Sequence, residues 1–119
     1  MAGRGATGSG GLAVRLAALS AAVAIAAGAF GAHGAAGKAA EWLRTGSAYQ
    51  LAHALAVILL ARTAGARGVP VWALFIGATV FAGTLYAMAL GAPRWLGAVT
   101  PIGGGMMILG WILVAWRVR

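Results

Sequence analysis

The chain has 119 residues, of which 62% are hydrophobic and 8% charged, whereas soluble domains carry roughly 25% charged residues. This composition excludes an ordinary soluble globule. Apolar runs of about 16 to 21 residues recur four times, which indicates a one-domain integral membrane protein. The absence of cysteine excludes disulfides, thiolate metal sites and a cysteine nucleophile.

The net charge of +8 does not indicate nucleic-acid binding, because the nine Lys and Arg residues are scattered at the ends of the apolar runs. In chain order, residues 1–11 are glycine-rich and are expected to form a flexible tail, followed by a single domain over residues 12–119. The first span is predicted over residues 12–32. Its basic start and small residues also resemble a secretory signal peptide, but the run is long enough to cross a membrane.

Three further spans are predicted, over about residues 46–61, 71–90 and 96–116. The polar residues 34–46 indicate either a short surface helix or the exposed first turns of the second span. Thr100 suits the N-cap of the last helix and Pro101 its first position. Because that leaves about sixteen residues to cross the bilayer, Trp95 to Val99 should enter it too, as a preceding turn or a kinked continuation.

Basic residues predict the orientation of this all-α, integral membrane four-helix bundle. Six of them fall on the side that holds the two termini and the middle loop, and three fall in the other two loops. The positive-inside rule then places both termini in the cytoplasm.

Tyr49, Gln50 and His53 form the only strongly polar group inside a predicted span. At about 100° per residue they lie within about 100° of one helix face. Because unpaired imidazole and carboxamide groups are costly in hydrocarbon, this face should meet other polar groups. The candidate partners are Tyr86 on the third helix, at the end of a face with Thr79 and Gly83, together with His33 and Thr100.

Two interpretations of this polar group remain open. Its members could be structural hydrogen-bonding groups between helices. Alternatively, His33 and His53 could bind a metal, a proton or a small ligand, because ionisable groups inside a membrane are functional candidates. They are weak metal candidates, because they lack ligand spacing and no carboxylate lies in a span. The helix start at Thr100 and Pro101 could also hold an anion or water.

Five segments carry a family resemblance. They are Gly28-Ala29-Phe30-Gly31-Ala32-His33-Gly34, Tyr49-Gln50-Leu51-Ala52-His53-Ala54-Leu55-Ala56, Phe81-Ala82-Gly83-Thr84-Leu85-Tyr86, Thr100-Pro101-Ile102-Gly103-Gly104 and Gly110-Trp111. In this order they resemble the small membrane proteins grouped as domain of unknown function 423. The resemblance implies a four-helix inner-membrane protein without an assigned activity, and it supplies no role for any residue.

The leading hypothesis is a non-enzymatic protein of the bacterial inner membrane, without a cofactor. It would act as a structural or accessory subunit whose polar residues hold the outer half of the bundle together. Its partners would be the lipid bilayer and either further copies of itself or a larger membrane complex, with no nucleic acid. The competing hypothesis is a binding or transport module for a small ligand, metal or proton that uses His33 and His53.

Overall fold

The computed structural model describes residues 9–118, and in this range it contains only helices. The elements are α2 (Ser9–His33), α3 (Gly37–Leu60), α4 (Val69–Ala89), the short 3₁₀ helix η1 (Arg94–Ala98) and α5 (Thr100–Arg117). The all-α class predicted from the sequence is therefore confirmed. The predicted flexible tail lies outside the described residues, except for residues 9–11, which form the first turn of α2.

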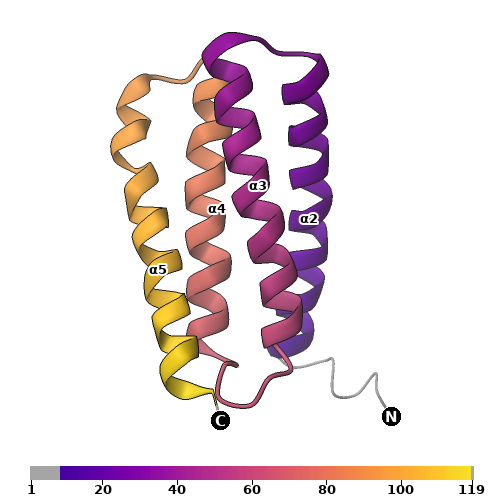
Figure 1. Ribbon diagram of the computed structural model, residues 1–119, viewed down its shortest axis with the longest axis vertical. Helices are drawn as coiled ribbons and strands as arrows, with labels where there is room; N and C mark the ends of the chain where they lie inside the picture. Colours follow the sequence, from indigo (N-terminus) through magenta and orange to yellow (C-terminus); the bar gives the residue numbers. More distant parts are fainter. Residues whose placement is uncertain (1–8, 119) are drawn as a thin grey trace.

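The four long helices run alternately up and down (Figure 1). α3 packs against α2 on one side and α4 on the other, and α4 packs in turn against α5. α2 and α5 lie at opposite edges of the molecule, so α3 and α4 form its centre (Figure 1). The first turn of α2, the loop at residues 61–68 and the last turn of α5 lie at the same end. We call this end the loop-and-terminus end.

Three helical segments within residues 9–118 are long and apolar enough to cross a membrane: Gly10–His33, Val69–Ala89 and Arg94–Arg117. α3 has 24 residues and matches its neighbours in length, but it is not among these segments. Its first two turns carry Lys38, Glu41 and Arg44, and its middle carries the polar group predicted from the sequence. These polar residues lower the hydropathy of α3.

Residues 34–36 precede α3 and residues 37–46 form its first turns, which is one of the two predicted alternatives. Glu41, the only acidic residue of the chain, lies 3.7 Å from Nζ of Lys38, and both side chains are more than half exposed. The pair is a surface ion pair of small energetic value. It lies at the end of the molecule opposite the loop-and-terminus end.

The start of α5 differs in one respect from the prediction. Residues 94–98 form a preceding turn of 3₁₀ helix, as one of the two alternatives proposed. Val99, however, is the N-cap, and Thr100 is the first residue of α5. The hydroxyl of Thr100 does not cap the helix, because it contacts Oγ1 of Thr84 at 2.6 Å and the carbonyl oxygen of Leu96 at 3.3 Å. Pro101 occupies the first turn, where its missing N–H costs no hydrogen bond.

Glycine allows α4 and α5 to pack backbone against backbone. A Cβ atom on Gly103 would lie 2.5 Å from the amide nitrogen of Phe81 and 2.6 Å from the carbonyl oxygen of Gly77. A Cβ atom on Gly77 would in turn lie 2.8 Å from the carbonyl oxygen of Gly103. Such close approach supplies the van der Waals contact that holds helices together in lipid.

Candidate polar site

His53 uses both nitrogens of its ring, one within α3 and one to link α3 to α5. Nδ1 lies 2.8 Å from the carbonyl oxygen of Tyr49, and Nε1 of Trp111 donates to Nε2 at 3.0 Å. An indole N–H can only donate, so Nε2 must accept and Nδ1 must carry the hydrogen. This neutral tautomer satisfies every polar atom of the ring. The side chain is buried, with 8% of its surface exposed.

Gln50 links α3 to two other helices through the two ends of its amide. Its Nε2 atom donates to Oγ of Ser20 on α2 at 2.9 Å, and its Oε1 atom accepts the hydroxyl hydrogen of Tyr86 on α4 at 2.5 Å. Gln50 is 6% exposed, so these hydrogen bonds lie largely in the interior of the protein. One amide therefore joins three helices.

Gly46, one turn before Gln50, makes room for the ring of Tyr86. A Cβ atom at position 46 would lie 2.7 Å from Cε1 of Tyr86 and 3.3 Å from its Cδ1. Any larger residue would push the ring away from α3. The hydrogen bond between Tyr86 and Gln50 therefore depends on the missing side chain of Gly46.

Thr84 and Thr100 form a third polar contact, between α4 and the start of α5. Their Oγ1 atoms lie 2.6 Å apart, and either can be the donor. Thr84 also reaches the carbonyl oxygen of Phe81 at 3.0 Å. Because each hydroxyl has only one hydrogen, one threonine donates to the other, and the second donates to a backbone carbonyl oxygen.

These contacts form three separate groups, Ser20–Gln50–Tyr86, His53–Trp111 and Thr84–Thr100, which we together call the interhelical polar network. It connects α2 with α3, α3 with α4 and α5, and α4 with α5. Its members are Ser20, Gln50, His53, Thr84, Tyr86, Thr100 and Trp111. Within residues 9–118, no buried side-chain nitrogen or oxygen lacks a hydrogen-bond partner. Each buried polar side-chain atom of the network thus has at least one partner within the protein.

Two predicted site residues are placed differently from the rest. Tyr49 is 48% exposed, and its ring packs against Phe81 and His53, with centroid distances of 4.9 and 6.3 Å. Tyr49 enters the network through its carbonyl oxygen rather than its hydroxyl. His33 is exposed at the end of α2, thirteen residues beyond Ser20, or roughly 20 Å at about 1.5 Å per residue. The structure does not bring it to His53.

Of the partner face proposed on the third helix, only one residue contacts the polar residues of α3. Tyr86 binds Gln50, as the sequence suggested, but the hydroxyl of Thr79 returns to the carbonyl oxygen of Phe75 in its own helix. A Cβ atom at Gly83 would meet nothing within 4 Å, so this glycine marks no close approach. Thr100 joins Thr84 instead of the polar residues of α3.

The described part of the chain offers no metal centre. No group of three His, Cys, Asp or Glu side chains comes together within residues 9–118. The whole chain has two histidines and one acid, and Glu41 faces Lys38 at the surface. A ligand that bound Nε2 of His53 would have to displace the indole N–H of Trp111.

Sequence reasoning missed Ser20 and Trp111. Ser20 is the only polar residue of α2 between Arg15 and His33, and that isolation in an apolar helix was the available signal. The indole N–H of Trp111 needs an acceptor when it lies away from water, which was the second signal. Ser20 lies near the middle of α2, and Trp111 lies in the half of α5 nearer its last residue. The network therefore extends along α5 from its first residue, Thr100, to beyond its middle.

Comparison with known families gives one matching model, described as a protein of unknown function (DUF423), over residues 27–104. This range covers more than half of the chain and ends within the first turns of α5. It includes Gln50, His53, Tyr86 and Thr100 but not Ser20 or Trp111. No solved structure matches the chain.

Several curated proteins are similar to the chain. UPF0382 membrane protein SH2409 of Staphylococcus haemolyticus is 41% identical over 70 residues, which cover 56% of the chain and 57% of that protein. A UPF0382 membrane protein of Haemophilus influenzae is 38% identical over 85 residues, covering 66% and 67%. UPF0382 inner membrane protein YgdD of Escherichia coli is 38% identical over 79 residues, covering 61% and 60%. The chain spans less than two thirds of the length of the first of these relatives.

Proposed function

Because the chain belongs to the DUF423 family, whose relatives are named membrane and inner membrane proteins, we propose that it is a non-enzymatic, multi-pass protein of the bacterial inner membrane. In this proposal it serves as a structural or accessory subunit. The interhelical polar network holds its helices in one arrangement. The observation that carries the proposal is that, within residues 9–118, every buried side-chain nitrogen and oxygen has a hydrogen-bond partner in the protein itself.

The chemistry of the network supports a structural role over a binding role. Both ring nitrogens of His53 and both ends of the Gln50 amide are used inside the protein. A site that binds a metal or carries a proton needs a lone pair or a hydrogen free for exchange. Interhelical hydrogen bonds of this kind contribute about 0.6 kcal/mol each on average, and they fix which helix faces meet.

We extend the proposal to the topology. All four long helices cross the bilayer, and both termini lie in the cytoplasm. For α3, the argument is its length and its packing between α2 and α4. Gln50 and His53, its two buried polar side chains, face protein partners instead of lipid. For the termini, the argument is the excess of basic residues at the loop-and-terminus end.

The competing binding function loses its main premise, a pair of histidines acting together. His33 is exposed and lies roughly 20 Å along α2 from the level of the network, as its position relative to Ser20 indicates. A site built on His53 alone would have to open the contact with Trp111. No observation on the described residues favours this second function.

Paired substitutions at the two histidines test the proposed role. The full chain is purified in mild detergent, its thermal unfolding is measured, and co-purifying small molecules and metals are analysed by mass spectrometry. We expect His53→Ala to lower the unfolding temperature and His33→Ala, the matched control, to leave it unchanged. A bound species that disappears in His53→Ala at unchanged stability would overturn the structural role in favour of a ligand site.

Reporter fusions test the topology independently. A reporter that is active only in the cytoplasm should be active at both ends of the chain. Activity at one end only would show an odd number of spans and overturn the proposal that all four long helices cross the membrane. Activity at neither end would reverse the orientation.

A further inference from the structure

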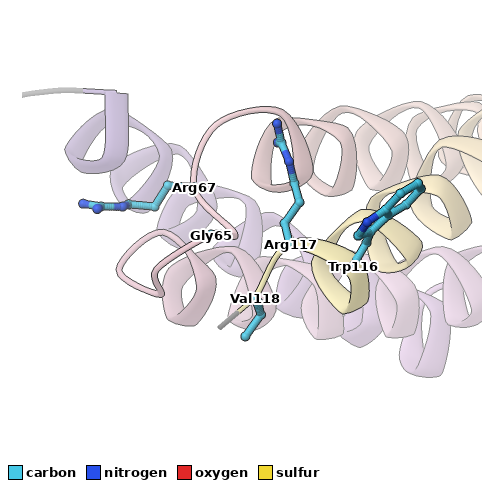
Figure 2. A pocket seen from close by; sticks show the side chains of 5 residues that line it. All are labelled: Gly65, Arg67, Trp116, Arg117 and Val118. Atoms are coloured by element: carbon cyan, nitrogen blue, oxygen red, sulfur yellow. The ribbon is translucent and has the colours of Figure 1, made fainter.

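A hollow of about 460 Å³ lies at the loop-and-terminus end. It is lined by Gly65 and Arg67 from the loop before α4 and by Trp116, Arg117 and Val118 from the end of α5. In Figure 2 the side chains of Arg67 and Arg117 extend in different directions, and the ring of Trp116 lies beyond Arg117. The hollow thus combines two cations with one large aromatic ring.

Gly65 sets the shape of this hollow. Its φ angle is +85°, and a Cβ atom there would lie 2.0 Å from the carbonyl oxygen of Arg117. Only glycine allows both the backbone conformation and the contact. The loop is therefore packed against the last turn of α5, and this contact holds Arg67 and Arg117 on the same hollow.

The charge of the hollow has no acidic side chain to balance it. Glu41 is the only acid in the chain, and it pairs with Lys38 at the opposite end. The loop-and-terminus end is therefore suited to an anion.

The aromatic ring indicates which anion. Trp116 is 81% exposed at the end of α5, and tryptophan at the end of a span lies at the level of lipid headgroups. Arginine binds phosphate oxygens in a bidentate manner. We propose that the hollow binds the phosphate group of an acidic phospholipid headgroup, such as phosphatidylglycerol, held by Arg67 and Arg117 with Trp116 against the acyl-glycerol region. This inference rests on the proposed membrane topology.

Lipid selectivity of the full chain tests the inference. The protein is reconstituted in nanodiscs of phosphatidylcholine with a minor fraction of phosphatidylglycerol, and the lipids retained after extraction are measured by native mass spectrometry. We expect wild type to retain phosphatidylglycerol in preference to phosphatidylcholine. Arg67→Gln and Arg117→Gln should each weaken this preference roughly fivefold, and the double variant roughly 30-fold.

Two comparisons separate a built site from general attraction to positive charge. Arg44→Gln/Arg94→Gln removes the same charge at the opposite end and should retain the wild-type preference. Gly65→Ala keeps every charge but displaces the loop from Arg117, and it should weaken retention. An equal loss of the preference for phosphatidylglycerol in the opposite-end control would overturn the proposal. So would wild-type retention of phosphatidylglycerol by both Gly65→Ala and the double Arg67/Arg117 variant.

Two further outcomes bear on the source of the phosphate and on the topology. Displacement of phosphatidylglycerol by millimolar inorganic phosphate would show a site for the free anion and overturn the lipid assignment. Incorporation of all variants into nanodiscs to the same extent shows that membrane insertion holds. If inserted wild type then shows no preference for phosphatidylglycerol, the result contradicts lipid binding at the hollow but does not contradict the proposed function.

Discussion

The indole N–H of Trp111 on α5 donates to Nε2 of His53 on α3 at 3.0 Å, and the two rings meet edge to face with centroids 5.8 Å apart. This contact fixes the tautomer of His53 and places α5 relative to α3, although α5 packs chiefly against α4. The contact can be tested by substitutions at either residue.

Trp111→Phe should destabilise the protein, because it keeps an aromatic ring but leaves Nε2 of His53 without a donor. We expect a loss of about 1–2 kcal/mol, the usual effect of leaving a buried polar atom unpaired. His53→Leu in the same background should restore part of the loss, since both polar partners are then gone. Reversible unfolding of the two single variants and the double variant measures the coupling energy. A coupling near zero would contradict the hydrogen bond.

Gln50→Leu should be the most damaging single change in the interhelical polar network, because it removes hydrogen bonds to both α2 and α4. Its size is nearly unchanged, so lost packing cannot account for the effect. We expect a destabilisation of about 1–3 kcal/mol, because the Tyr86 hydroxyl and Ser20 lose their partner. Tyr86→Phe, which breaks one bond and leaves the ring in place, should cost less. An equal or larger cost for Tyr86→Phe would show that Gln50 does not join three helices.

Gly46→Ala should destabilise the protein although alanine favours helix. The added Cβ atom would meet Cε1 of Tyr86 at 2.7 Å and force the ring away from Gln50. Gly83→Ala on α4 is the matched control, because its Cβ atom meets nothing within 4 Å and the helix gains roughly 0.5–1 kcal/mol. Thermal unfolding in detergent should therefore shift in opposite directions for the two variants. If both alanine substitutions stabilised the protein, the close contact between Gly46 and the Tyr86 ring would be disproved.

Gly103→Ala should separate α4 from α5, since its Cβ atom would lie 2.5 Å from the backbone nitrogen of Phe81. Backbone atoms cannot rotate out of the way as a side chain can, so we expect a loss of about 2 kcal/mol or more. Gly105→Ala, two residues along the same helix, meets nothing within 4 Å and serves as the control. Tryptophan fluorescence during denaturation measures the stability of the two variants. Similar stability for the two alanine variants would disprove the close approach of α4 and α5.

The sequence predicted four long helices because their signals are local. Apolar runs, the turn near Pro70 and the break before Pro101 are each visible within a few residues. The start of α3 at Gly37 was harder, because charged residues suit both a surface helix and the exposed turns of a longer one. The N-cap of α5 was misplaced for another reason: Thr100 has a partner on α4, which local rules do not include.

The polar group on α3 was predictable, whereas its partners were only partly so. Gln50 and His53 are conspicuous in an apolar helix, and Tyr86 was among the candidates for their partner face. Ser20 and Trp111 lie 30 and 58 residues away from the atoms that they bind, so no periodicity within one helix relates them. His33 looked equivalent to His53 in the sequence. Its place at the open end of α2, however, separates it from the network in space.

The role of α3 as the common partner has a consequence for biosynthesis. When α3 leaves the ribosome, Ser20 is already present, but Tyr86 and Trp111 have not yet been made. At that stage Nε2 of His53 and Oε1 of Gln50 lack partners, and the segment is also the least apolar of the four. Translocon-mediated integration of α3 should therefore be incomplete in nascent chains that stop before α4, and should become efficient once the last helix has emerged.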